Sequence, residues 1–162
     1  MPSPLPVLLT LTLAAGAAHA EFLHVEQAVT GLDCASCAQS VDKTLMKIKG
    51  VGSASFRLQD ATAIVDLKPA NRVPLDDLRD ALKRIGYTPA EARVTVRGQA
   101  RREGGKWLFR VAGGAAEYQL DPAGKDVEGQ LGAGADGVLI LEGSIAAGRG
   151  AALKVVSARR SE

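Results

Sequence analysis

The sequence has little cysteine, few aromatic side chains and almost no excess charge. Aromatic residues make up 4% of its 162 residues, whereas glycine occurs 18 times. Many glycines between short apolar runs favour turns and strands over long helices. A formal net charge of +2 does not by itself indicate a nucleic-acid-binding protein, and a chain that is 46% hydrophobic and 23% charged is too apolar to be disordered. The length allows one or two small domains.

Charge is missing altogether from the first part of the chain. The run Leu5–Ala18 contains no charged residue and is followed by the small-residue pattern Ala18-His19-Ala20. This pattern predicts a cleavable signal peptide over residues 1–20, because the run is shorter than the roughly 20 apolar residues that span a bilayer. No Lys or Arg precedes the run, which departs from typical signal peptides. We expect a mature chain that begins near Glu21, is periplasmic or secreted, and is not inserted into a membrane.

Hydrophobic periodicity predicts alternating strands and helices over residues 21–93. Two segments have the apolar spacing of amphipathic helices, and Gly50 and Gly86 follow them as stop signals. The predicted elements are strand, helix, strand, strand, helix and strand, at Phe22–Val29, Ser36–Lys49, Val51–Leu58, Ala61–Leu67, Pro74–Ile85 and Tyr87–Arg93. Gln27 interrupts the apolar face of the first strand. This order predicts a ferredoxin-like α+β domain, in which two helices lie on one face of an antiparallel sheet.

The chain's two cysteines, Cys34 and Cys37, fall in the loop after the first predicted strand, with Cys37 at the start of the first helix. The free N–H groups and the helix dipole at that place stabilise a thiolate, which is the form that binds metal. Two thiols at this spacing are compatible with three chemistries. They are chelation of a soft metal ion, a dithiol–disulfide cycle, and a structural disulfide, which export would permit.

The stretch GLDCASC, residues 31–37, resembles the metal-binding loop of the heavy-metal-associated domain family, in which a glycine precedes C-x-x-C. Two further stretches, KGVGSASFRL and LRDALKRIGYTP, look like that family's entry into its second strand and its second helix ending in Gly-Tyr. The family includes domains of copper chaperones, of metal-exporting P-type ATPases and of the periplasmic mercury-binding protein. The resemblance implies that Cys34 and Cys37 bind one soft ion (Cu⁺, Zn²⁺ or Hg²⁺) and pass it to a metal transporter or another carrier.

Three neighbouring positions are interpreted through the same resemblance. Leu32 stands where the family usually has Met, which is a volume-conserving change beneath the loop. Tyr87 occupies the family's aromatic position near the loop, where it either supports the site or simply packs. Asp33 is a possible third ligand, because domains serving zinc, cadmium or lead exporters often have Asp there and a carboxylate suits Zn²⁺ better than Cu⁺. The alternative for Asp33 is a solvated loop residue.

No helical periodicity follows Arg93, and residues 94–162 are predicted to form a small all-β domain. Short strands between glycine-rich turns favour a five-stranded barrel, and the strand-Gly-polar endings VRGQ and LEGS resemble an OB-fold. The strands are expected at residues 94–96, 107–111, 118–120, 138–145 and 153–158, and a glycine-rich loop is expected at residues 129–137.

Basic residues cluster on the first two strands of this second segment. The cluster consists of Arg97, Arg101, Arg102, Lys106 and Arg110. Single-strand binders combine such a surface with stacking aromatics. The alternation of Trp107 and Phe109 fits a core better, so we interpret the cluster as a solvated strand face and expect no nucleic-acid partner.

The sequence therefore predicts an exported metal carrier or scavenger rather than an enzyme. One alternative is a periplasmic thiol–disulfide oxidoreductase, which also uses C-x-x-C at a helix start. The aromatic residue and the proline that usually surround the redox motif are missing. The other alternative is a metal-free interaction module with an oxidised pair. No glycine-rich phosphate loop precedes a helix, no carboxylate pair suits acid–base chemistry, and His24 stands alone on a strand.

Overall fold

The computed structural model describes residues 21–31, 35–111, 117–148, 150 and 152–161, with only the backbone for residues 35–38. The predicted signal peptide lies outside these residues. The elements are β1 (Glu21–Thr30), α1 (Ala35–Leu45), β2 (Val51–Arg57), the 3-10 turn η1 (Leu58–Asp60), β3 (Thr62–Leu67), α2 (Leu75–Arg84), β4 (Thr88–Glu103), β5 (Lys106–Arg110), β6 (Glu117–Pro122), α3 (Lys125–Gly134), β7 (Leu139–Ile145) and β8 (Leu153–Arg160). Within the part described, no helix is long and apolar enough to cross a membrane.

The first half has the predicted ferredoxin-like arrangement. Strands β2, β3, β1 and β4 are neighbours in that order and pair antiparallel, with α1 following β1 and α2 following β3. The apolar stripe of α2 is buried as expected, because Leu75, Leu78 and Leu82 are each 1% exposed or less. Acidic residues occupy the first turn of α2 and basic residues its last turn, which suits the helix dipole.

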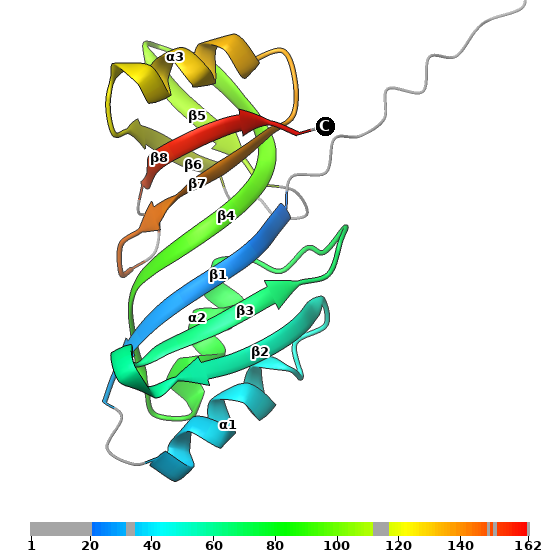
Figure 1. Ribbon diagram of the computed structural model, residues 1–162, viewed down its shortest axis with the longest axis vertical. Coiled ribbons are helices and arrows are strands. Elements are labelled where there is room, and N and C mark those ends of the chain that lie inside the picture. Colours follow the sequence, from blue (N-terminus) through cyan, green and yellow to red (C-terminus); the bar gives the residue numbers. More distant parts are fainter. Residues whose placement is uncertain (1–20, 32–34, 112–116, 149, 151, 162) are drawn as a thin grey trace, which may run out of the picture.

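The long strand β4 belongs to both halves of the molecule. Over one stretch it pairs with β1 on one side and with β7 on the other, so that Ala92 is opposite both Gln27 and Ile145. The predicted boundary between residues 93 and 94 falls inside this strand. The expectation of two separate strands there is wrong, because no turn-forming residue interrupts the chain at Arg93-Val94. Figure 1 shows β4 running diagonally along the long axis and connecting the two halves.

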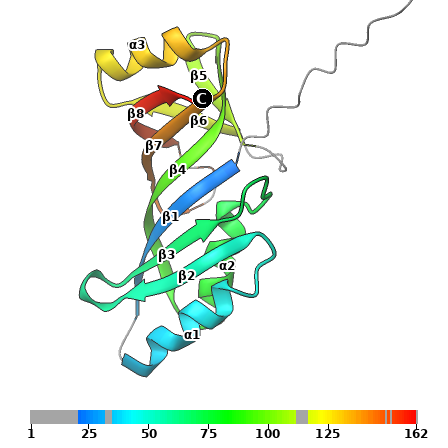
Figure 2. The ribbon, with the colours of Figure 1, turned by 45° about the vertical axis from the view of Figure 1, so that its right-hand side comes forward.

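The second half closes into a ring of strands. Strand β4 pairs with β5, β5 with β6, β6 with β8, β8 with β7, and β7 again with β4. All these pairs are antiparallel except β6–β8, which is parallel. Each of the five predicted strands overlaps one of the five observed strands β4 to β8. The side chains of Phe109, Leu131, Leu141 and Val155 are fully buried in the core. Figure 2 shows this half stacked on the ferredoxin-like half, with α3 at the far end from α1.

The helix α3 contradicts the expected glycine-rich loop at residues 129–137. Its sequence contains three glycines, which are poor helix formers. Tertiary packing outweighs that cost, since Leu131 is fully buried and a Cβ on Gly134 would lie 2.2 Å from Leu139 Cδ2. Glycine therefore lets α3 approach β7 closely, which the local sequence pattern could not indicate.

Candidate metal-binding loop

The candidate loop is framed by the end of β1 and the start of α1. Strand β1 ends at Thr30 and α1 begins at Ala35, so that the backbone of Cys37 lies in the first turn of the helix. Residues Leu32, Asp33 and Cys34 lie outside the described part of the chain, as does the side chain of Cys37. The frame places Cys37 where unpaired backbone N–H groups and the positive end of the helix dipole favour a thiolate.

Two glycines meet at the base of this loop. Gly31 has φ +89° and Gly86 has φ +94°, the left-handed region that favours glycine. A Cβ on Gly31 would lie 3.7 Å from the carbonyl oxygen of Gly86, so the end of β1 and the end of α2 are adjacent. The Gly-Tyr pair that follows α2 is therefore beside the start of the loop, as its resemblance to the family implies.

Tyr87 is buried next to this junction. It is 6% exposed, belongs to the hydrophobic core, and its backbone N–H donates to the carbonyl of Leu82 over 3.1 Å. Packing in the core is thus one observed role of Tyr87. Any direct support of the metal loop by its side chain stays a prediction.

A buried polar pair joins β1, the strand that leads into the loop, to α2. Gln27 of β1 is 0% exposed and Arg79 of α2 is 3% exposed, and Arg79 Nε donates to Gln27 Oε1 over 3.0 Å. Gln27 Nε2 in turn donates to the carbonyl of Ala90 over 2.9 Å. The interruption of the apolar face at Gln27 is therefore a structural contact, and the sequence pattern did not identify Arg79 as its partner.

The same guanidinium binds the second half of the molecule. Its remaining N–H groups donate to the carbonyls of Ile145, Ala146 and Gly148, at 3.0, 2.9 and 2.9 Å, at the end of β7 and in the connection after it. Burial lowers the pKa of Arg79, but a guanidinium stays protonated in proteins. One buried cation thus joins α2, β1 and the barrel.

The basic cluster on β4 and β5 is largely ion-paired. Arg101 contacts Glu103 and Glu117, Arg110 lies 3.6 Å from Glu117, and Arg97 pairs with the buried Glu21. Arg102 lies 3.7 Å from Glu128 and 5.7 Å above the Trp107 ring centre. Phe109 is fully buried and Trp107 is 8% exposed, as the alternation on β5 predicts. Arg101, Arg102 and Arg110 are exposed and paired with carboxylates, which fits the interpretation of a solvated strand face.

His24 has partners on the open face of the sheet. Its Nδ1 lies 2.6 Å from Asp66 Oδ1, and Ser53 Oγ donates to Asp66 Oδ2 over 2.8 Å. These hydrogen bonds, that of His24 above all, lower the pKa of Asp66. Asp66 lies between the other two side chains, so His24 does not connect a hydroxyl to a carboxylate as a catalytic triad requires. Among the described residues, no group of three or more His, Cys, Asp and Glu side chains could hold a metal ion.

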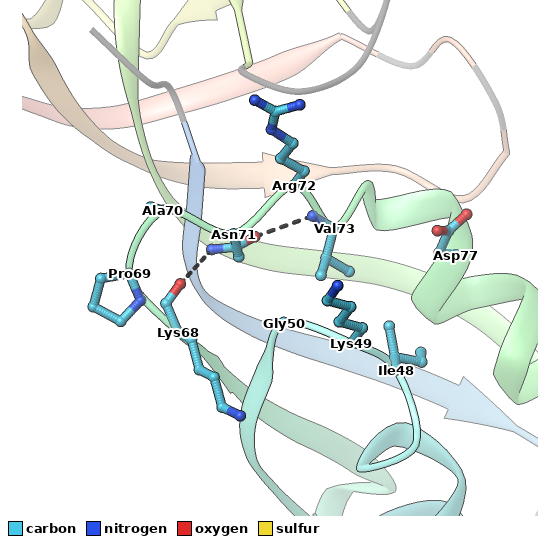
Figure 3. A pocket seen from close by; sticks show the side chains of 10 residues that line it. All are labelled: Ile48, Lys49, Gly50, Lys68, Pro69, Ala70, Asn71, Arg72, Val73 and Asp77. Atoms are coloured by element: carbon cyan, nitrogen blue, oxygen red, sulfur yellow. Dashed lines mark hydrogen bonds between the residues drawn. The ribbon is translucent and has the colours of Figure 1, made fainter. Parts of the chain in front are cut away.

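A cavity of about 520 Å³ lies at the other end of the ferredoxin-like half, beside the start of β1. The buried Asn71 fixes one wall, because its side chain donates to the carbonyls of Phe22 and Lys68 and accepts from the Val73 N–H. Figure 3 shows that the side chains of Lys68 and Arg72 point in different directions and do not converge on one point. None of its lining residues belongs to the metal loop, and these two basic side chains do not form one binding site.

Residues 27–88 match the family model described as heavy-metal-associated domain. Within this region the chain is 34% identical over 59 residues to a copper-exporting P-type ATPase of Bacillus subtilis, a match that covers 36% of this chain and 7% of the ATPase. It is 36% identical over 63 residues to the copper-transporting ATPase RAN1 of Arabidopsis thaliana, covering 39% of this chain and 6% of RAN1. The chain thus spans less than a tenth of the length of these curated relatives.

Two solved structures resemble the same half. One is a copper-binding domain from HMA7, a P-type ATPase, with 32% identity, 44% of this chain and 92% of that chain covered, and a TM-score of 0.39. The other is the CopZ metallochaperone, with 27% identity, 41% and 97% covered, and a TM-score of 0.38. The match to the family model shows that the chain carries a heavy-metal-associated domain at residues 27–88, which confirms the resemblance stated above.

Proposed function

We propose that this chain is an exported metal-binding protein that captures one soft metal ion through the thiolates of Cys34 and Cys37 and passes it to a transporter or another carrier. The observation that supports this most directly is the position of C-x-x-C. The motif lies between β1 and the first turn of α1, within the region that matches the heavy-metal-associated domain. Binding and transfer need no catalytic group, because thiolate ligands can be exchanged one at a time between two proteins.

Copper(I) is the ion that we propose first. The ATPases to which residues 27–88 are similar are named copper-exporting or copper-transporting. Two thiolates without other donors suit Cu⁺, which prefers soft ligands. Zn²⁺ and Hg²⁺ are the alternatives, and Zn²⁺ would gain most if Asp33 is a third ligand.

The proposal also includes the location of the protein and the role of its second half. The apolar run and the Ala18-His19-Ala20 pattern support a periplasmic or secreted location. The closed five-stranded ring, with α3 between β6 and β7, supports an OB-like barrel. Because four of the five basic residues in the cluster on β4 and β5 are ion-paired, we propose that the barrel binds a protein partner or has a structural role.

Replacing either Cys34 or Cys37 by serine should abolish tight metal binding. A hydroxyl is a poor ligand for soft ions, so we expect the Cu⁺ affinity to fall by about 100-fold or more. The measurement is an anaerobic titration of the reduced mature chain with Cu⁺ against a competing chelator. Ser36→Ala, which keeps both thiols, is the matched control and should bind one ion per chain.

Unchanged stoichiometric binding in both serine variants would disprove this proposal. A wild-type chain that binds no soft ion but reduces a disulfide substrate would support the oxidoreductase instead. Thiol counting on protein freshly isolated from its native compartment, repeated after adding a reductant system and metal, separates both from the metal-free module, whose two cysteines would stay fully oxidised.

Asp33→Ala tests the third ligand. If the carboxylate binds the ion, the variant should lose about 10-fold in Zn²⁺ affinity and little in Cu⁺ affinity, because only the harder ion benefits from an oxygen donor. Asp136→Ala, which removes an exposed carboxylate from the barrel, is the control. Equal Zn²⁺ affinities for both variants would show that Asp33 is a solvated loop residue.

A further inference from the structure

We propose that two copies of this chain associate through the edge of β2, which pairs antiparallel with the β2 of a second copy. Within the described part of the chain, β2 is the strand at the open end of the sheet. The opposite end is closed, because β4 pairs with β7 and completes the ring. The backbone N–H and C=O groups along the outer side of β2 are thus available to another strand.

The β2 strand has few of the features that usually keep an exposed edge strand from pairing with another chain. Its sequence is VGSASFR, without proline and without charge until Arg57. A register shift between Val51 and Ser53 disturbs only its first residues. Natural edge strands are normally blunted by charges, prolines or bulges along their length. The regular stretch from Ser53 to Arg57 is left exposed or half-exposed, apart from its pairing with β3.

The side chains of β2 are complementary to themselves in an antiparallel pair centred on Ala54. In this register Ser53 faces Ser55 of the second copy, and Phe56 lies opposite Gly52, the residue that the register shift leaves without a partner on β3. A half-buried phenyl ring would then cover a residue without a side chain, while two exposed serines could hydrogen-bond across the junction. Such a pair has two-fold symmetry, which is the commonest symmetry of protein dimers.

The charge at the end of the strand does not oppose this pairing. Arg57 faces Val51 of the second copy in the same register. Its guanidinium is already held within its own chain, since Arg57 Nε and Nη2 each donate to Asp60 over 2.8 Å. No like charges therefore face each other along the paired strands, which is the arrangement that would destabilise them.

The geometry also separates this contact from metal binding. Strands β1 and β2 run in the same direction, because each is antiparallel to β3. The metal loop follows β1, so in an antiparallel β2 pair the two metal loops lie at opposite ends of the junction. The dimer therefore needs no metal and leaves both loops accessible.

The first test measures the molar mass of the mature chain by sedimentation, from low micromolar to near-millimolar concentration, in the metal-free Cys34→Ser/Cys37→Ser background. We expect the mass to rise towards twice the monomer value. The double variant Ser53→Lys/Ser55→Lys places like charges directly opposite each other and should raise the dissociation constant at least about 10-fold. Gln119→Lys/Val156→Lys adds the same charge on exposed strand positions of the barrel and should not change it.

The second test uses a cysteine on the two-fold axis. In the same background, Ala54→Cys should form a disulfide-linked dimer on mild oxidation, whereas Val156→Cys, which is at a 58% exposed position, should not. Circular dichroism establishes that each variant is folded. A chain that stays monomeric throughout, or a dimer that the two lysines at 53 and 55 do not weaken, would overturn the proposal.

Discussion

Replacing Arg79 by methionine will lower the free energy of unfolding by about 3–5 kcal/mol. The guanidinium is 3% exposed and donates to Gln27 and to the carbonyls of Ile145, Ala146 and Gly148. Methionine fills similar space but leaves these buried acceptors without a donor, and each unsatisfied group costs about 1–3 kcal/mol. Denaturant unfolding, monitored by circular dichroism, measures this change in the free energy of unfolding.

The control for this change lies on the same helix. Arg84→Met removes an exposed cation from the last turn of α2 and should cost less than about 1 kcal/mol. Arg79→Lys keeps the charge but cannot supply the forked set of N–H groups. The free energy of unfolding of this variant should therefore lie between the values for Arg79→Met and Arg84→Met. If Arg79→Met were no more destabilising than Arg84→Met, the guanidinium would not hold the two halves together.

Arg79 also shows where a sequence pattern stops being informative. Local periodicity identified the stripe Leu75, Leu78 and Leu82 correctly, because a helix buries the same face whatever lies beyond it. The neighbouring Arg79 is buried by a segment more than 60 residues later in the chain, and no local period encodes such a contact. The sequence showed that Gln27 interrupts an apolar strand face, but it did not indicate that Arg79 is the partner of Gln27.

The same contrast explains the rest of the fold. The ferredoxin-like half was predictable because its strands and helices are local units with clear stop signals at Gly50 and Gly86. The helix α3 was missed because its stability comes from Leu131 and from the contact of Gly134 with Leu139, not from helix propensity. The continuity of β4 was missed because strands expected in two separate domains turned out to share one pair of neighbours, β1 and β7.

For the candidate metal-binding site, the sequence predicted the position of the motif but not the identity of the ion. The C-x-x-C motif and its frame are local, so the sequence located Cys37 at the start of α1, as the backbone shows. The contact between Gly31 and Gly86 joins two distant segments and was not predicted, although the resemblance to a known family indicated that Tyr87 lies near the loop. The choice of ion depends on the positions of side chains in the loop, whereas the sequence pattern gives only the residue types, two thiols and one carboxylate.

Replacing Gly143 by alanine will destabilise the barrel by about 3 kcal/mol or more. A Cβ at this position would lie 2.1 Å from the carbonyl oxygen of Lys154 and 3.0 Å from its carbonyl carbon. Gly143 pairs with Val94 of β4 and with Val155 of β8, at a register shift between β7 and β8. Since the clash is with backbone between two paired strands, a side-chain rotation cannot relieve it, and overpacking of this kind costs about 1–3 kcal/mol or more.

The fluorescence of Trp107, the one tryptophan in the chain, reports on this half directly. Gly132→Ala is the matched control, because Gly132 is an exposed helical residue and its added Cβ would meet no atom within 4 Å beyond the backbone of its own helix. Alanine is the better helix former by about 1 kcal/mol, so this control should be neutral or stabilising. A Gly143→Ala chain as stable as the wild type would mean that β7 and β8 can separate without loss. The barrel would then not be a closed ring, and the end of β7, which Arg79 binds, would be paired with the rest of the sheet through β4 alone.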